Sequence, residues 1–149
     1  MATRARLRKL DLCMMGSGEA SRSSYPSLRS RSVLDAAVAG ATDMKAEDIV
    51  ALDVRELTSF ADTFLIVTAT SDRRARAITD SIVRATGGIG RKPAGIEGYD
   101  EGRWVLIDLD ELIVHVFQEA VRSEYDLERL WSDATSIDIA IDSGRTAAQ

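Results

Sequence analysis

The chain has 149 residues, of which 45% are hydrophobic and 29% are charged, enough for one globular domain with a moderate core. A single cysteine and a single histidine exclude an intrachain disulfide framework and a zinc site of ordinary ligand count, so no metal or cofactor is expected. No apolar run approaches the roughly 18 residues that a membrane span requires, which predicts a soluble protein.

Charge is distributed unevenly along the chain. Residues 1–34 hold seven Lys and Arg against two Asp and Glu, so residues 35–149 hold twelve against twenty-two, a net charge of −10. A nucleic-acid groove needs clustered cations to neutralise phosphates, and therefore no direct nucleic-acid site is expected in the acidic part. A basic protein partner fits it better, because opposite charges speed encounter and set the register.

The N-terminal residues 1–32 are rich in arginine and serine and have little to bury, which predicts a disordered extension. The same composition is typical of an organelle transit peptide, so mitochondrion or plastid is the alternative to a bacterial cytoplasmic location. A folded domain is expected over residues 33–134, followed by a flexible tail over residues 135–149.

Helical and extended patterns alternate through the expected domain. In chain order we expect a helix over residues 33–42 capped by Ser30 or Ser32, strands over 49–54 and 63–69, a helix over 72–85, an extended segment over 94–97, a hairpin over 104–117, helical turns over 119–123 and 126–131, and an edge strand over 137–141. Residues 63–69 are apolar on both alternations, which is typical of a central strand covered on both sides. The order predicts an α/β or α+β fold, a mixed β-sheet with helices packed on it.

The densest run of strand formers lies between Gly102 and Phe117 and is interrupted at Asp110-Glu111. It predicts strands over 104–109 and 112–117 joined by a two-residue turn, so that Leu109 faces Leu112. One face of the hairpin is then wholly aliphatic and belongs to the core. The other face carries a mixed set of side chains, namely Trp104, Leu106, Asp108, Ile113, His115 and Phe117.

Two interpretations fit the mixed face of the hairpin. The face could be a protein-binding patch formed by Trp104, Leu106 and Ile113 beside a carboxylate, because aromatic anchors ringed by polar groups are typical of interface hot spots. Alternatively, the C-terminal helical turns cover the face, with Leu130 and Trp131 packed against it. The two interpretations can hold for different residues of the face.

Only one group of residues in the sequence could hold a metal ion, namely Asp108-Leu109-Asp110. Alternating carboxylates on a strand point to one side, where a divalent cation could bind a triphosphate, so a metal-dependent nucleotidyltransferase is the alternative function. Phosphoryl chemistry also calls for a glycine-bearing phosphate loop, and the helix entry at Thr70-Ser71 has no glycine. A general base at His115, near Asp108, is a weaker alternative.

Six segments form an ordered set of specific motifs: LDVRELTSFAD (52–62), TSDR (70–73), EG (97–98), WVLID (104–108), VHVF (114–117) and YDLERLW (125–131). Together they closely resemble the ribosomal silencing factor family, also called Iojap-like proteins, over about residues 33–134. The family usually has Asp-Tyr-Gly-Asp where this chain has Asp108-Leu109-Asp110-Glu111. The chain therefore lacks the aromatic side chain at position 109, and Asp110 replaces a glycine that would favour positive φ.

The resemblance implies a nucleotidyltransferase-like fold without catalytic residues, and hence no enzyme. It implies a factor that binds the large ribosomal subunit through the fourteenth large-subunit protein, blocks association with the small subunit and represses translation under nutrient limitation. A homodimer is implied as well. The partner-binding residues carried over to this sequence are Trp104, Leu106, Asp108, Leu109, Asp110 and Glu111.

Overall fold

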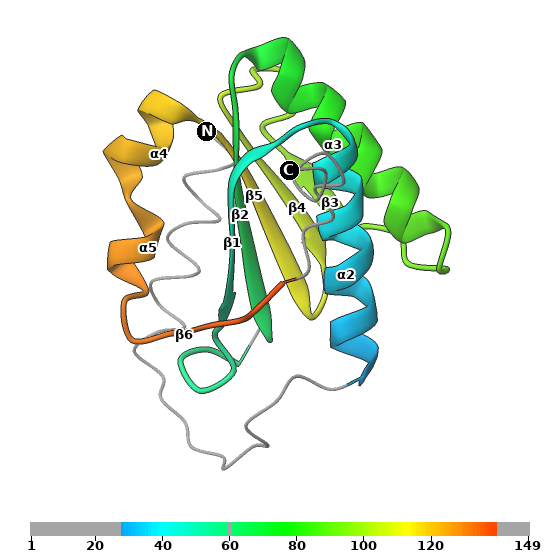
Figure 1. Ribbon diagram of the computed structural model, residues 1–149, viewed down its shortest axis with the longest axis vertical. Coiled ribbons are helices and arrows are strands. Elements are labelled where there is room, and N and C mark those ends of the chain that lie inside the picture. Colours follow the sequence, from blue (N-terminus) through cyan, green and yellow to red (C-terminus); the bar gives the residue numbers. More distant parts are fainter. Residues whose placement is uncertain (1–27, 60, 140–149) are drawn as a thin grey trace, which may run out of the picture.

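The computed structural model describes residues 28–59 and 61–139, which form a mixed six-stranded sheet between two helical layers (Figure 1). The strands are β1 (Glu47–Asp53), β2 (Thr63–Ala69), β3 (Gly95–Glu97), β4 (Trp104–Leu109), β5 (Leu112–Gln118) and β6 (Thr135–Ser136); the helices are α2 (Leu28–Asp43), α3 (Asp72–Gly87), α4 (Glu119–Tyr125) and α5 (Leu127–Leu130). The sheet order is β3-β4-β5-β2-β1-β6, with β2 and β5 parallel and all other neighbours antiparallel. The expected mixed sheet with packed helices is confirmed.

Strand β2 is the centre of the sheet. All seven of its residues are buried, as the unbroken apolar pattern predicts, because helices cover both faces. Helices α2 and α3 pack on one face, and α4 and α5 lie on the other (Figure 1). Within the described residues, no helix is long and apolar enough to cross a lipid bilayer.

The β4–β5 hairpin has the predicted strands and the predicted register. Leu109 pairs with Leu112, Ile107 with Val114, and the intervening turn has two residues. The aliphatic face of the hairpin packs against α2 and α3 in one hydrophobic cluster. The mixed face belongs to a second cluster, which α4 and α5 complete.

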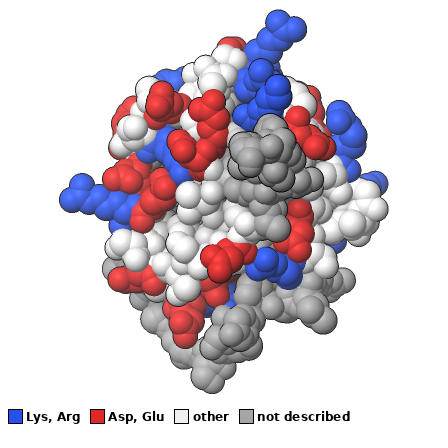
Figure 2. All heavy atoms as spheres, in the orientation of Figure 1, with Lys and Arg blue, Asp and Glu red and all other residues white. Residues whose placement is uncertain are grey.

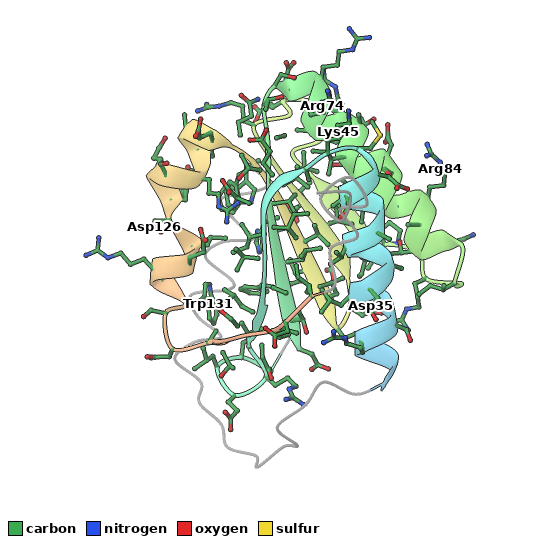
Figure 3. The ribbon with its side chains drawn as sticks, in the orientation of Figure 1. Asp35, Lys45, Arg74, Arg84, Asp126 and Trp131 are labelled. Atoms are coloured by element: carbon green, nitrogen blue, oxygen red, sulfur yellow. The ribbon has the colours of Figure 1, made fainter. Side chains whose placement is uncertain are left out.

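Helix α3 begins at the predicted residue and ends two residues later than predicted. The side-chain oxygen of Ser71 accepts the backbone N–H of Arg74 at 3.1 Å, which satisfies one of the free donors of the first turn. The helix ends at Gly87. Arg74 and Arg84 point away from the sheet into solvent, on the side opposite the buried stripe (Figure 3).

The first helix and the last strand of the structure begin earlier than the sequence predicts. Helix α2 begins at Leu28, so Ser30 and Ser32 are within it and do not cap it; several serines precede the apolar stripe, and the sequence does not choose among them. The edge strand β6 pairs with the end of β1 at residues 135–136, ahead of the expected segment 137–141. Residues 1–27 and 140–149, where disorder and a flexible tail were expected, lie outside the described residues.

Gly40 of α2 lies at the closest approach of α2 to α3. A Cβ at this position would lie 2.8 Å from the Ser81 carbonyl oxygen and 2.9 Å from the Cα of Ile82. The hydroxyl of Ser81 donates to the Gly40 carbonyl oxygen at 2.7 Å. The glycine that lowers helix propensity is therefore required by the packing of the two helices.

We expect Gly40→Ala to lower the free energy of unfolding by about 1–3 kcal/mol, because the added methyl group meets backbone atoms that cannot rotate away. Gly87→Ala is the matched control, since nothing lies within 4 Å of a Cβ at that helical residue. The control is expected to be neutral or to stabilise by up to about 1 kcal/mol. Urea unfolding measures both, and equal changes in the two variants would contradict the packing argument.

Candidate partner-binding surface

The six predicted partner-binding residues do not gather at one place. Trp104 begins β4, whereas Asp110 and Glu111 form the turn beyond its other end, about 20 Å away at roughly 3.3 Å per residue. Trp104 and Leu106 are only 6% and 1% exposed beneath α4 and α5, and Leu109 is 2% exposed on the opposite face. Partner binding by these residues stays a prediction, and three of them, Trp104, Leu106 and Leu109, lie in the core.

The turn of the hairpin is held in one conformation. Asp110 has a φ of 69°, the left-handed region that a glycine would favour, and its backbone N–H donates to the carboxylate of Asp108 at 3.1 Å. The side chain of Glu111 forms an ion pair with Arg91, and its carbonyl oxygen accepts the N–H of Asp62 at 2.8 Å. Asp110 is exposed, so its carboxylate is the charge that this turn presents to solvent.

The carboxylates of the turn are not arranged as a metal site. Strand β4 ends at Leu109, so Asp110 lies in the turn and not beside Asp108 on a strand face, as the expected alternation required. Asp108 accepts a hydrogen bond from the turn, and Glu111 is paired with a cation. Across residues 28–59 and 61–139 there is no group of three or more His, Cys, Asp or Glu that could hold a metal ion. This geometry disfavours the nucleotidyltransferase alternative.

His115 lies in the aromatic layer under α4. Its Nδ1 accepts a hydrogen bond from the indole Nε1–H of Trp104 at 3.2 Å, and its ring stacks near Phe117. Because His115 is fully buried, desolvation lowers its pKa from 6.5 to about 3, so the imidazole is neutral at ordinary pH. This burial disfavours the general-base alternative.

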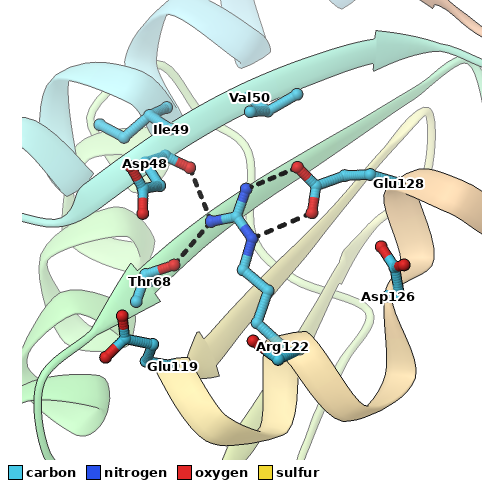
Figure 4. A pocket seen from close by; sticks show the side chains of 9 residues that line it. Asp48, Ile49, Val50, Thr68, Glu119, Arg122, Asp126 and Glu128 are labelled. Carbon is cyan, nitrogen blue, oxygen red and sulfur yellow. Dashed lines mark hydrogen bonds and ion pairs between the residues drawn. The ribbon is translucent and has the colours of Figure 1, made fainter.

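A pocket of about 650 Å³ opens at the ends of β2 and α4, at a place that no sequence motif indicates (Figure 4). The side chain of Arg122 crosses it and donates to Glu128 at 3.1 and 2.9 Å, to the Asp48 carbonyl oxygen at 2.7 Å and to the Thr68 hydroxyl at 2.6 Å. These four residues come from α4, α5, β1 and β2. Sequence periodicity does not predict such a site, because its members are brought together only by the packing of the elements.

Acidic side chains outnumber basic ones around this pocket. Its lining includes four carboxylates and one arginine, namely Asp48, Glu119, Asp126, Glu128 and Arg122. Figure 2 likewise shows more red than blue on the α4 and α5 side of the molecule. This side of the described structure therefore matches a positively charged partner better than an anionic one.

Residues 27–149 match the sequence model of a family described as "Ribosomal silencing factor during starvation". The chain belongs to the ribosomal silencing factor family. The silencing factor RsfS of Bacillus subtilis is 42% identical over 112 residues, which cover 75% of this chain and 95% of that protein. RsfS of Halalkalibacterium halodurans is 37% identical over 112 residues, covering 75% of this chain and 96% of that protein.

The fold of this silencing-factor chain also matches a solved structure. A crystal structure of a Chromobacterium violaceum protein superposes with a TM-score of 0.67 at 32% identity, covering 76% of this chain and 95% of the other. Both sequence and fold thus confirm the family that the motifs indicate. The family match extends from residue 27 to residue 149, and so it includes α2 from its first residue and the edge strand β6.

Proposed function

We propose that this chain binds the large ribosomal subunit through a basic protein, the fourteenth of that subunit, and blocks association with the small subunit. The effect would be lower translation under nutrient limitation. The family match over residues 27–149 carries the proposal. Such a factor needs no chemistry, because a folded domain on the joining surface obstructs by its volume and by its occupancy.

Features of the described structure support a preformed docking surface. The turn of the β4–β5 hairpin is fixed by the Arg91–Glu111 ion pair and by the hydrogen bond between Asp110 and Asp108, so little conformational entropy is lost on binding. Its exposed carboxylate has the sign that a basic protein selects. Trp104 and Leu106 hold the strand in place from the core side.

The proposed function is tested by mixing purified large and small ribosomal subunits with increasing amounts of this protein. Subunit joining is followed by light scattering, and the subunits are separated on a sucrose gradient. We expect joining to slow in proportion to occupancy and the protein to sediment with free large subunits. Undiminished joining at saturating protein would overturn the proposal.

Asp110→Asn is expected to weaken binding to large subunits by about three- to tenfold at low salt, because it removes the exposed charge of the turn. Asparagine tolerates positive φ, so the turn keeps its conformation. Asp43→Asn, an equal change of charge at the exposed end of α2, is the control. The difference between the two variants should shrink as salt is raised, and equal affinities at low salt would exclude the turn from the interface.

Three further parts of the proposal follow from the family. We infer a non-catalytic role, which agrees with the names of its relatives as silencing factors. A homodimer and a bacterial cytoplasmic location are proposed, with mitochondrion or plastid as the alternative location. Analytical ultracentrifugation of the purified chain tests the homodimer.

A further inference from the structure

The α4–α5 corner is built from two pieces of helix that are too short to be stable alone. Helix α4 has seven residues and α5 has four, and isolated helices of this length do not persist in water. Between them, Asp126 has a φ of 45° and interrupts the helical path. The position of the corner on the sheet must therefore be set by contacts with the rest of the fold.

Arg122 supplies polar contacts to three elements around the corner. Its Nε and Nη2 form a two-pronged ion pair with Glu128 of α5, and its Nη1 donates to Thr68 of β2 and to the carbonyl oxygen of Asp48 of β1 (Figure 4). The arginine side chain is only 12% exposed, and its hydrogen bonds to Glu128 and Thr68 are partly buried, whereas the one to Asp48 is exposed. Lysine cannot reproduce them, because its ammonium group lacks the planar fork.

One side of the α4–α5 corner covers the mixed face of the hairpin, and the other side is exposed to solvent. Tyr125 packs on Trp104 with ring centroids 4.7 Å apart, and Trp131 packs edge-on against Phe64 at 5.0 Å. On the outside, Leu130 is 41% exposed, although its apolar side chain was expected to cover the sheet. A shift of the α4–α5 corner would thus move Tyr125, which packs on Trp104, and would also move the exposed face of α5.

We propose that Arg122 is a positioning residue for partner binding: by fixing the α4–α5 corner on β1 and β2, it sets the surface that a basic large-subunit protein contacts. The inference rests on the proposed function and extends it from the hairpin turn to a second element. Arg122 acts on the binding surface without contacting the partner itself. Its guanidinium is neutralised by Glu128 and acts through the backbone and side chains that it holds.

The test compares Arg122→Lys with wild type in two independent measurements on the full chain. Amide hydrogen exchange at Leu130 and Trp131, whose N–H groups donate to Asp126 and Leu127 at 3.2 and 2.8 Å, reports the corner without any partner. We expect exchange there to be at least about tenfold faster, and the dissociation constant for large subunits to rise at least about tenfold. Glu128→Gln should give smaller changes of the same sign, because it leaves the contacts to β1 and β2.

Two controls separate positioning from loss of stability. Arg84→Lys makes the same substitution at an exposed arginine of α3, in the opposite helical layer, and should change neither measurement. Gly40→Ala destabilises the opposite helical layer and should leave affinity unchanged while the protein is folded. Arg122→Lys with faster exchange but wild-type or stronger affinity would overturn the inference, as would unchanged exchange. If the wild-type protein does not bind large subunits, the proposed function is overturned, and so is the claim that Arg122 affects binding. The hydrogen-exchange rates then still test whether Arg122 fixes the α4–α5 corner.

Discussion

Replacement of Trp104 by alanine is expected to lower the free energy of unfolding by about 3–5 kcal/mol, the cost of emptying a large aromatic site in a packed core. Trp104 is 6% exposed and lies between the rings of Phe117 and Tyr125, at centroid distances of 4.8 and 4.7 Å. The substitution also removes the donor to His115, which would leave a buried ring nitrogen without its partner. Chemical denaturation followed by circular dichroism measures the effect.

Trp104→Phe is the informative companion variant. It keeps an aromatic ring at the site and removes the five-membered ring of the indole with its N–H, so its loss of stability should be well below that of the alanine variant. If Trp104 is also a binding hot spot, the folded Phe variant should lose affinity for large subunits beyond what its stability explains. Stability of Trp104→Ala within about 1 kcal/mol of wild type would show that the aromatic layer is not a packed core.

Acidification is expected to destabilise the protein through His115. Its folded pKa of about 3 lies below the ordinary 6.5, so the neutral ring contributes stability that is fully present above pH 6.5 and is lost as pH falls toward 3. At pH 4.5 the loss relative to pH 7 is about 2–3 kcal/mol from this group alone, because the unfolded chain binds the proton and the folded core does not.

His115→Phe isolates this contribution from the carboxylates that titrate in the same range. The variant keeps a flat ring beside Phe64 and Phe117 but cannot be protonated. Urea midpoints of both proteins are measured between pH 7 and pH 4.5, and the wild type should show the steeper fall. Parallel pH profiles would mean that the imidazole is charged, or reaches water, in the folded state.

The elements themselves follow from local chemistry. The unbroken apolar run of β2 predicts a central strand, and the two-residue turn of the hairpin fixes which side chains share a face, because the side-chain period of a strand is two. Ser71 caps the start of α3 for an equally local reason. The order and spacing of the family motifs also lie wholly in the sequence, which explains why the family could be named without a structure.

The arrangement of the surface could not be predicted in the same way. Whether Trp104 is a cover for the core or an exposed anchor depends on where α4 and α5 pack, and the hairpin pattern is identical in both cases. The pocket around Arg122 joins residues from four elements that are distant in sequence. The start of α2 was predicted too late, since adjacent serines offer equivalent caps.

The sequence by itself determined strands β1 to β5, the hairpin register, the family and the acidic character of the folded part, because each depends on residues that are neighbours along the chain or on simple totals of charge. Only the tertiary structure decided which predicted contact residues are buried, how Asp110 is held at the turn, and that Arg122 joins the α4–α5 corner to β1 and β2. Those features depend on the packing of segments that are distant in the sequence. The neighbours of a side chain in the core come from such segments, and a local sequence pattern does not predict where they lie.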